Sequence, residues 1–345
     1  MMAIPLNDLA ARHRLLLDDP RLLDVVLKDH AFISPGHVVP HASLRPEGLA
    51  RYDAQFHPRG IAYRANPVQR ALAHHRERPR SLIAEWSALA LFGLEEFSSG
   101  ADTTLLCSSD RKLAADALQA TVRRRKKHHT RLALRRQGIV VPVTDHMQTL
   151  SACLKSLDKK EHAWGILADL KMDPVTVMSV QLIDSFYRFF KCGPADVRAG
   201  LAGVYSSRRL EKILALSCTG AESKPETILR LLAREAVADL PWVRLETQIP
   251  VYTDGTVGEA GEIRNDKVLL TVFDLADRRL RVGFMYDGEH HLQRGQRDKD
   301  TEITADLLAF GWRLLRTSAG MLRRTSDTQR RVRTLMLRAA DEASR

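Results

Sequence analysis

Residues 266–291 of this chain read DKVLLTVFDLADRRLRVGFMYDGEHH, and this stretch decides the fold of the C-terminal third. Residues 268–275 and 280–286 are rich in β-branched and other apolar residues, and the short segment ADRR separates them. Two such runs with a short turn between them predict two strands that pair as a hairpin.

The hairpin carries two candidate site residues. Side chains alternate across a strand, so Val272 and Asp274 are expected to share one face of the first strand. Gly283, Met285 and Asp287 are expected to share one face of the second strand, which is largely apolar on both faces, as in a covered central strand. A lone carboxylate there is costly unless it is paired or bound to a metal ion. Asp274 and Asp287 are therefore singled out.

The segments on either side of the hairpin predict an α/β domain over residues 221–345. Glu226 follows Pro225 in the first turn of an expected helix, where both residues are favourable, so its plain interpretation is complementation of the helix dipole. Gly311 is expected to end a later helix. The expected elements are helix 227–237, strand 243–251, the hairpin, helix 297–310, strand 312–317 and an arginine-rich helix from residue 319.

The first 220 residues are expected to be mainly helical. Residues 1–75 carry leucines at helical spacing and several prolines and glycines, which predicts a small helical module. Residues 76–220 are expected to form a largely helical middle domain, in which 83–92 is a buried helix closed by Gly93. The predicted fold class is therefore an α+β multidomain protein.

The charge of the chain favours a polyanionic partner, most simply nucleic acid. The 53 Lys and Arg residues outnumber the 42 Asp and Glu residues, which gives a net charge of +11. Residues 121–136, TVRRRKKHHTRLALRR, contain no acid. This density of cations indicates either a solvated surface or a contact with phosphates. The candidate nucleic-acid residues are Arg123, Arg124, Arg125, Lys126, Lys127, Arg131, Arg135 and Arg136.

Cysteine spacing and apolar run length bear on location. The four cysteines are far apart and lack the spacing of a zinc site, which predicts free thiols in a reducing compartment. No apolar run approaches the roughly 20 residues of a membrane span, and the first residues lack a signal-peptide core. We therefore expect a soluble, cytoplasmic protein without membrane contact.

Three C-terminal passages resemble a known family, actinobacterial proteins with an AbiEi-type antitoxin-like N-terminal half and a C-terminal DUF559/Vsr-like endonuclease domain of the PD-(D/E)XK class. These passages are SKPETILRLLAREA at 223–236, FDLADRRLRVGFMYDGEHH at 273–291 and D-x10-GWRLLR at 300–316. Upstream, LIAEWSALALFGL at 82–94 and GIVVPVTDHMQTL at 138–150 are similar to the AbiEi-like half. The first 75 residues match only loosely the winged helix-turn-helix that relatives often carry there.

The resemblance implies a restriction-endonuclease-like fold with a metal-dependent site in the C-terminal domain. It places Asp274 in the first acidic position of the family's motif and Asp287 at the aspartate of E-x-D-G. It makes His291 the following histidine and Glu226 the helix glutamate. Asp274, Asp287 and Glu226 would hold Mg²⁺ or Mn²⁺, which polarises the phosphoryl group and activates a water.

The sequence departs from the family at Met285, which stands where E-x-D-G has its glutamate. A thioether is a poor ligand for Mg²⁺. The Glu289 carboxylate and the Tyr286 carbonyl are two possible replacements.

Three functions stay open on the sequence. The first is a Mg²⁺- or Mn²⁺-dependent DNA endonuclease in defence, which rests on Asp274, Asp287 and His291. The second is a non-catalytic DNA-binding regulator of antitoxin type with a degenerate nuclease fold, which rests on the basic segment 121–136. The third is an antitoxin that holds a cognate toxin. The target sequence, DNA or RNA as the ligand, and the oligomeric state are not determined by these patterns.

Overall fold

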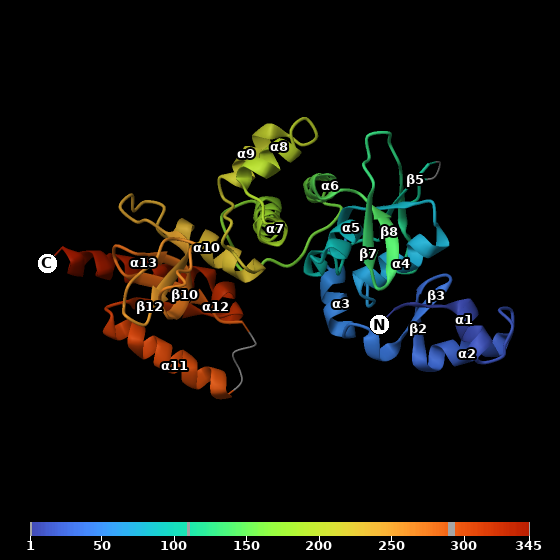
Figure 1. Ribbon diagram of the computed structural model, residues 1–345, viewed down its shortest axis with the longest axis horizontal. Helices are drawn as coiled ribbons and strands as arrows, with labels where there is room; N and C mark the ends of the chain where they lie inside the picture. Colours follow the sequence, from blue (N-terminus) through green and yellow to red (C-terminus); the bar gives the residue numbers. More distant parts are fainter. Residues whose placement is uncertain (1, 109–110, 289–293, 345) are drawn as a thin grey trace. The chain divides into compact units, whose positions relative to one another are not determined.

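The computed structural model describes residues 2–108, 111–288 and 294–344 of the chain (Figure 1). The described residues form helices and three β-sheets, so the expected α+β class is confirmed. They divide into two compact units. The N-terminal unit comprises Met1–Gly165 and Ala195–Ser207, and the C-terminal unit comprises Ile166–Pro194 and Arg208–Arg345.

The N-terminal unit begins with a small sheet in the strand order β1-β3-β2. Its elements are β1 (Ile4–Pro5), α1 (Leu6–Arg12), α2 (Pro20–Asp29), β2 (His30–Ser34), β3 (His37–Pro40) and α3 (Glu47–Ala54). Leu9 of α1 and Val26 of α2 pack against Val38 of β3. The expected small helical module therefore contains a sheet as well, because Pro35-Gly36 forms a tight turn that pairs β2 with β3.

A second sheet of the same unit has the strand order β6-β5-β4-β8-β7. Its strands are β4 (Leu82–Ala84), β5 (Thr104–Cys107), β6 (Thr121–Arg124), β7 (Leu132–Arg136) and β8 (Ile139–Val143). β4 pairs antiparallel with β5 and parallel with β8, and β5 pairs parallel with β6. The first part of the expected helical middle region therefore contains this sheet, whereas residues 146–214 form helices, as expected.

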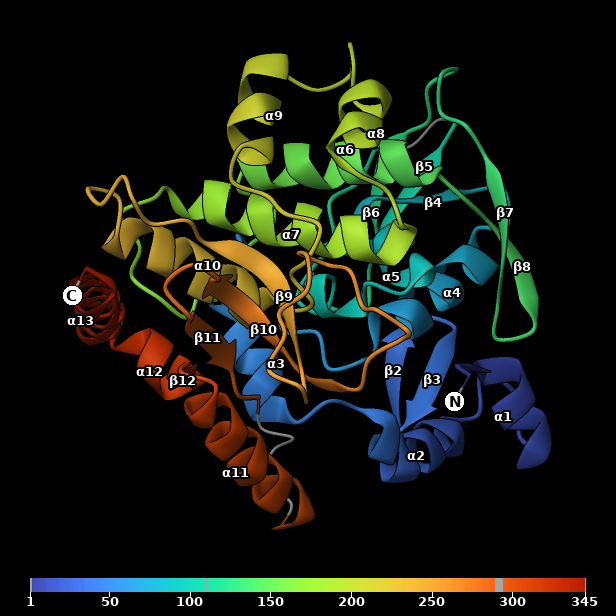
Figure 2. The same ribbon diagram turned by 60° about the vertical axis from the view of Figure 1, so that its left-hand side comes forward.

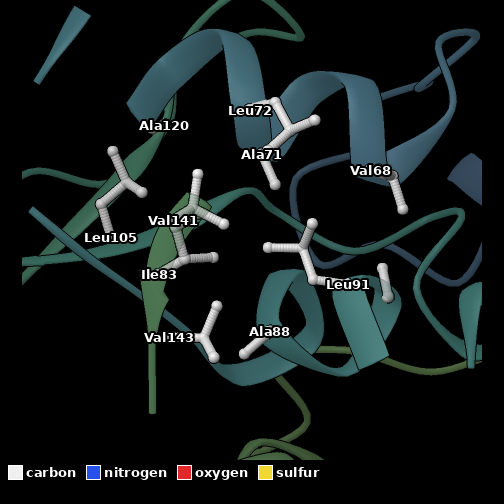
Figure 3. Packing of buried hydrophobic residues seen from close by; sticks show 11 residues of the cluster. Val68, Ala71, Leu72, Ile83, Ala88, Leu91, Leu105, Ala120, Val141 and Val143 are labelled. Atoms are coloured by element: carbon white, nitrogen blue, oxygen red, sulfur yellow. The ribbon is translucent and has the colours of Figure 1, made fainter. Parts of the chain in front are cut away.

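Two helices, α4 (Pro67–Glu77) and α5 (Glu85–Phe92), pack on this second sheet. Figure 3 shows Leu72 of α4 and Leu91 of α5 directed toward Ile83, Val141 and Val143 of the sheet. The mainly apolar run that predicted one buried helix from residue 83 is strand β4 followed by α5, whose C-cap is Gly93 with φ 119°.

The apolar core that α4 shares with the sheet lies across the domain boundary expected at residue 75. Helix α4 spans residue 75, and its Val68, Ala71 and Leu72 belong to the core of the second sheet. A boundary at this position would cut through one helix and one apolar core.

The C-terminal unit contains a four-stranded sheet in the order β12-β11-β10-β9. Its elements are α10 (Lys224–Ala236), β9 (Glu246–Tyr252), β10 (Leu269–Asp277), β11 (Val282–Tyr286), α11 (Arg294–Ala309), β12 (Arg313–Thr317), α12 (Ala319–Arg323) and α13 (Thr325–Ala343). β9, β10 and β11 are antiparallel neighbours, and β12 runs parallel to β11. The expected hairpin and the expected order of elements are confirmed.

The core of this sheet explains why Gly283 is needed. Helices α10 and α11 lie on opposite sides of the sheet (Figures 1 and 2). On the α11 side, Leu307 packs with Phe273 of β10 and with Trp312. A Cβ atom at Gly283 of β11 would collide with the Phe273 ring, so the close approach of the two strands requires glycine.

The remaining helices are divided between the two units. Helix α7 (Pro174–Phe190) and all but the first residue of α9 (Ser207–Leu214) belong to the C-terminal unit. Helix α6 (His146–Asp158) and all but the first residue of α8 (Pro194–Gly200) belong to the N-terminal unit. The buried carboxylate of Asp184 on α7 forms an ion pair of 2.5 Å with Arg230 on α10. This interaction explains why the unit does not start at residue 221 as expected. No helix among the described residues is both long and apolar enough to cross a membrane.

Candidate functional site

Asp274 lies near the middle of β10, where the sheet is distorted. Its neighbours Phe273 and Leu275 pair with Ile249 and Thr247 of β9. Gln248, the residue between these partners, has φ 55°, a left-handed conformation that is uncommon for a residue with a side chain. On the other side of β10, the Tyr286 amide at the end of β11 donates a hydrogen bond of 2.6 Å to the Asp274 carboxylate.

The Asp274 carboxyl group is held in an environment that disfavours its charge. Burial, followed by the negative charges of Glu226, Glu222 and Asp287, raises the pKa of Asp274 to about 7, although the hydrogen bond from the Tyr286 amide lowers it. Like charges this near to a poorly hydrated carboxyl favour its protonated form. The structure therefore brings Glu226, Asp274 and Asp287 into one electrostatic neighbourhood.

Glu226, however, is occupied in capping α10. Its carboxylate accepts hydrogen bonds from the Glu222 amide, at 2.7 Å, and from the Ser223 hydroxyl, at 2.9 Å. The Ser223 oxygen in turn accepts from the Glu226 amide, which completes a capping box. The contacts of Glu226 therefore fit its plain interpretation, which is stabilisation of a helix N-terminus.

Asp287 is occupied by an arginine. Arg316 of β12 donates to both carboxylate oxygens of Asp287, from Nε at 2.9 Å and from a terminal nitrogen at 2.8 Å. The same guanidinium lies 3.2 Å from Asp300. Two-point contacts between arginine and carboxylate are strong and directional, so this contact holds Asp287 away from other ligands.

The side chain of Met285 is placed in the apolar core and not at a ligand position. Its side chain is half-buried and packs against the apolar cluster that includes Phe273 and Trp312. Its carbonyl accepts a hydrogen bond of 3.0 Å from the Thr317 hydroxyl. The thioether therefore fills the core where the family motif has a carboxylate. His291 and Glu289, the other motif residues, lie outside the described residues.

These contacts can be tested against the needs of a divalent cation. Mg²⁺ and Mn²⁺ require several oxygen ligands at one point. Within residues 2–108, 111–288 and 294–344, no group of three or more His, Cys, Asp and Glu side chains is placed to hold a metal ion. Glu226 is bound in its cap and Asp287 in its ion pair. The three predicted ligands, as placed, do not fit a Mg²⁺ or Mn²⁺ site.

The basic segment 121–136 runs from one edge of the second sheet to the other, since β6 and β7 are its two edge strands. Arg123 is half-buried and pairs with Glu85 at 2.8 Å and with Glu161 at 2.7 Å. Arg136 is half-buried and donates to the Leu91 carbonyl. The remaining six candidates are exposed: Arg124, Arg125, Lys126, Lys127, Arg131 and Arg135.

Comparisons with protein-family models, with curated proteins and with solved structures gave no match to this chain.

Sequence reasoning missed Arg316 and Glu85, although both had a detectable signal. Arg316 stands in the apolar run WRLLRT, where a charged residue on a strand needs a partner. Glu85 follows three apolar residues directly, yet it was taken as part of a buried helix. Their partners lie on other strands and could not be identified from one strand alone. The register places Arg316 beside Met285, from where its side chain reaches Asp287, and Arg123 of β6 reaches Glu85.

Proposed function

We propose that this chain is a DNA-binding protein whose C-terminal unit has the architecture of a PD-(D/E)XK nuclease but does not cleave its ligand. The order α10, β9, β10, β11, α11, β12 and the motif passages that resemble such nucleases support the architecture. The net charge of +11 and the exposed cations of the basic segment support a nucleic-acid ligand.

The observation that carries the loss of cleavage is the contact between Arg316 and Asp287. A nuclease of this class needs that carboxylate to hold a divalent cation. Here both of its oxygens are bonded to one guanidinium. With Met285 packed in the core, two of the motif's acidic positions supply no ligand.

The cleavage test uses supercoiled plasmid with Mg²⁺ or Mn²⁺. We expect the wild type to nick the plasmid no faster than an Asp274→Ala variant does. We also expect the wild type to bind the plasmid as tightly with EDTA as with the metal ion. Metal-dependent nicking by the wild type that is lost in Asp274→Ala would refute the proposal.

The binding test measures affinity for a DNA duplex against salt. If about five of the six exposed cations contact phosphates, the slope of log K against log salt is about −4 to −5. Reversing the charge of Lys126 and Lys127 together should weaken binding and reduce the slope by about 2. The control is Arg51→Glu, an exposed arginine of α3 that pairs with Glu47. Equal slopes for the wild type and the Lys126/Lys127 variant would exclude the segment as the DNA contact.

A second candidate function, metal-dependent phosphodiester hydrolysis, is favoured by Asp274. Its carboxyl group is buried beside other acids, and within the described part of the chain no ion pair joins it to a cation. A cation would relieve this repulsion. Titration of the full chain with Mn²⁺ separates the candidates, since micromolar binding that Asp274→Asn abolishes favours hydrolysis.

A further inference from the structure

The N-terminal unit contains a cavity of about 630 Å³ that the DNA-binding proposal does not explain. It is lined by β4, β6 and α6, together with residues that follow β5. A volume in this range is typical of sites for small organic ligands, which are concave and only partly polar. A DNA duplex is too wide to enter such a cavity.

Cations dominate the wall of the cavity. They are Arg111, Lys112, Arg123, Arg124, Lys126, Lys155 and Lys159. Loss of water contact, followed by the charges of Lys126 and Lys159, lowers the pKa of Lys155. Within the described chain, no carboxylate forms an ion pair with these three lysines. Glu85 and Glu161 offset only part of this positive charge, so the cavity is suited to an anion.

The helix α6 presents its cavity-lining groups at regular spacing. Ser151, Lys155 and Lys159 follow each other at intervals of four residues, which places them on one side of a helix. Ser151 is only 4 % exposed, and its hydroxyl has no hydrogen-bond partner in the structure. A buried hydroxyl without a partner is unfavourable, and a ligand in the cavity would satisfy it.

The cavity is also lined by Glu85, which stands at the junction of β4 and α5. Its side chain is 12 % exposed, and its carboxylate lies 2.8 Å from Arg123. Its φ of 52° is a strained conformation for a residue with a side chain, and such strain is often retained at binding sites. Arg123 also holds Glu161, so one guanidinium fixes two carboxylates against the cavity.

We propose that this cavity binds a nucleoside phosphate, with the phosphate group on Lys126, Lys155 and Lys159 and the nucleoside against Ser151 and Glu85. The lysines supply the charge that a phosphate needs. The carboxylate accepts hydrogen bonds from hydroxyl or amino groups, which a nucleoside has and inorganic phosphate lacks. Apolar wall residues such as Leu106 and Val122 contribute contact surface.

The proton balance of Glu85 gives the proposal a second readout. Burial, with a smaller contribution from the charge of Glu161, raises the pKa of Glu85 to about 7, although Arg123, Thr104 and Lys159 act to lower it. A hydrogen-bond donor from the nucleoside would favour the ionised carboxylate, so nucleoside binding through Glu85 should release protons near neutral pH.

The test is equilibrium dialysis of the full chain with adenosine and guanosine mono- and diphosphates, with adenosine and with inorganic phosphate. We expect at least one nucleotide to bind at least tenfold more tightly than inorganic phosphate or adenosine. The Lys155→Ala/Lys159→Ala double variant should weaken that binding at least tenfold, and Ser151→Ala should weaken it severalfold. Arg51→Ala, at an exposed position of α3 that does not line the cavity, is the control and should bind nucleotide as the wild type does.

Two results would overturn the proposal. One is that none of the nucleotides binds below about 1 mM, and the other is that the lysine double variant binds as tightly as the wild type. Equal affinity for inorganic phosphate would exclude the nucleoside part. DNA affinity is measured on the same samples, so loss of the nucleotide site is distinguished from failure of the DNA-binding proposal. Thermal unfolding of each variant checks that it is folded.

Discussion

Replacement of Asp274 by asparagine should stabilise the C-terminal unit at neutral and alkaline pH. The pKa of Asp274 is raised from 3.8 to about 7 by burial and by the neighbouring acids. The folded protein therefore keeps a proton that the unfolded chain releases above about pH 4. Stability that depends on this proton is present at low pH and is lost as the pH rises through about 7. Asparagine resembles the protonated carboxyl in shape and never acquires the charge.

The magnitude follows from the pH interval. Between pH 5 and the pKa of about 7, wild-type stability should fall relative to Asp274→Asn by about 2.7 kcal/mol, at about 1.4 kcal/mol per pH unit. Because solvent reaches part of the site, we expect about 2 kcal/mol. Urea unfolding of the full chain, followed by circular dichroism at pH 5 and pH 8, measures this difference.

The control for this experiment is Asp239→Asn. Asp239 is exposed and pairs with Arg333, and its pKa is lowered, so it stays ionised over the whole interval. A stability difference between the wild type and Asp274→Asn that does not change with pH would refute the reasoning. Mn²⁺ that restores wild-type stability at pH 8, but has no effect on Asp274→Asn, would instead favour a metal site.

Three further variants test the packing around the site, and urea unfolding with the wild type as reference measures each of them. Gly283→Ala should destabilise the C-terminal unit by about 1–3 kcal/mol, because the added methyl group meets the Phe273 ring; an unchanged midpoint would contradict the close approach. Arg230→Met should cost about 3–5 kcal/mol by leaving the Asp184 carboxylate buried without its partner, and adding Asp184→Asn should recover part of the loss. Ser223→Ala should cost about 1 kcal/mol through the cap of α10, whereas no change would mean that the capping box is dispensable.

The C-terminal sheet could be predicted because its strands have unambiguous patterns. Residues 268–275 and 280–286 are apolar, short and separated by a turn, and Gly311 ends α11 before β12. Such signals are local in sequence, so one chain is enough to detect them. The pairing of β12 with β11 is not local, and it decides that Arg316 reaches Asp287.

The sheet of the N-terminal unit could not be predicted for two reasons. Its strands β6 and β7 are edge strands, where charged side chains are tolerated and discourage further pairing, so their arginines concealed the β pattern. Strand β4 has only 3 residues, and only Glu85 separates it from the apolar residues of α5. An apolar run of this kind does not separate a strand from a buried helix by its periodicity.

The charges of the two units suggest a division of roles between them. Around Asp274, the acids Glu222, Glu226 and Asp287 outnumber the arginines that pair with them, Arg188 and Arg316, so DNA phosphates are repelled there unless a cation intervenes. In the N-terminal unit the cations outnumber the acids, both along the exposed basic segment and in the cavity. The proposed DNA contact is therefore expected on the exposed basic segment and not beside Asp274. A phosphate could approach Asp274 only together with a metal ion. The carboxylates of Glu226 and Asp287 are already bonded within the protein, so they do not supply ligands for that ion. Binding without cleavage, the function proposed above, agrees with both charge distributions.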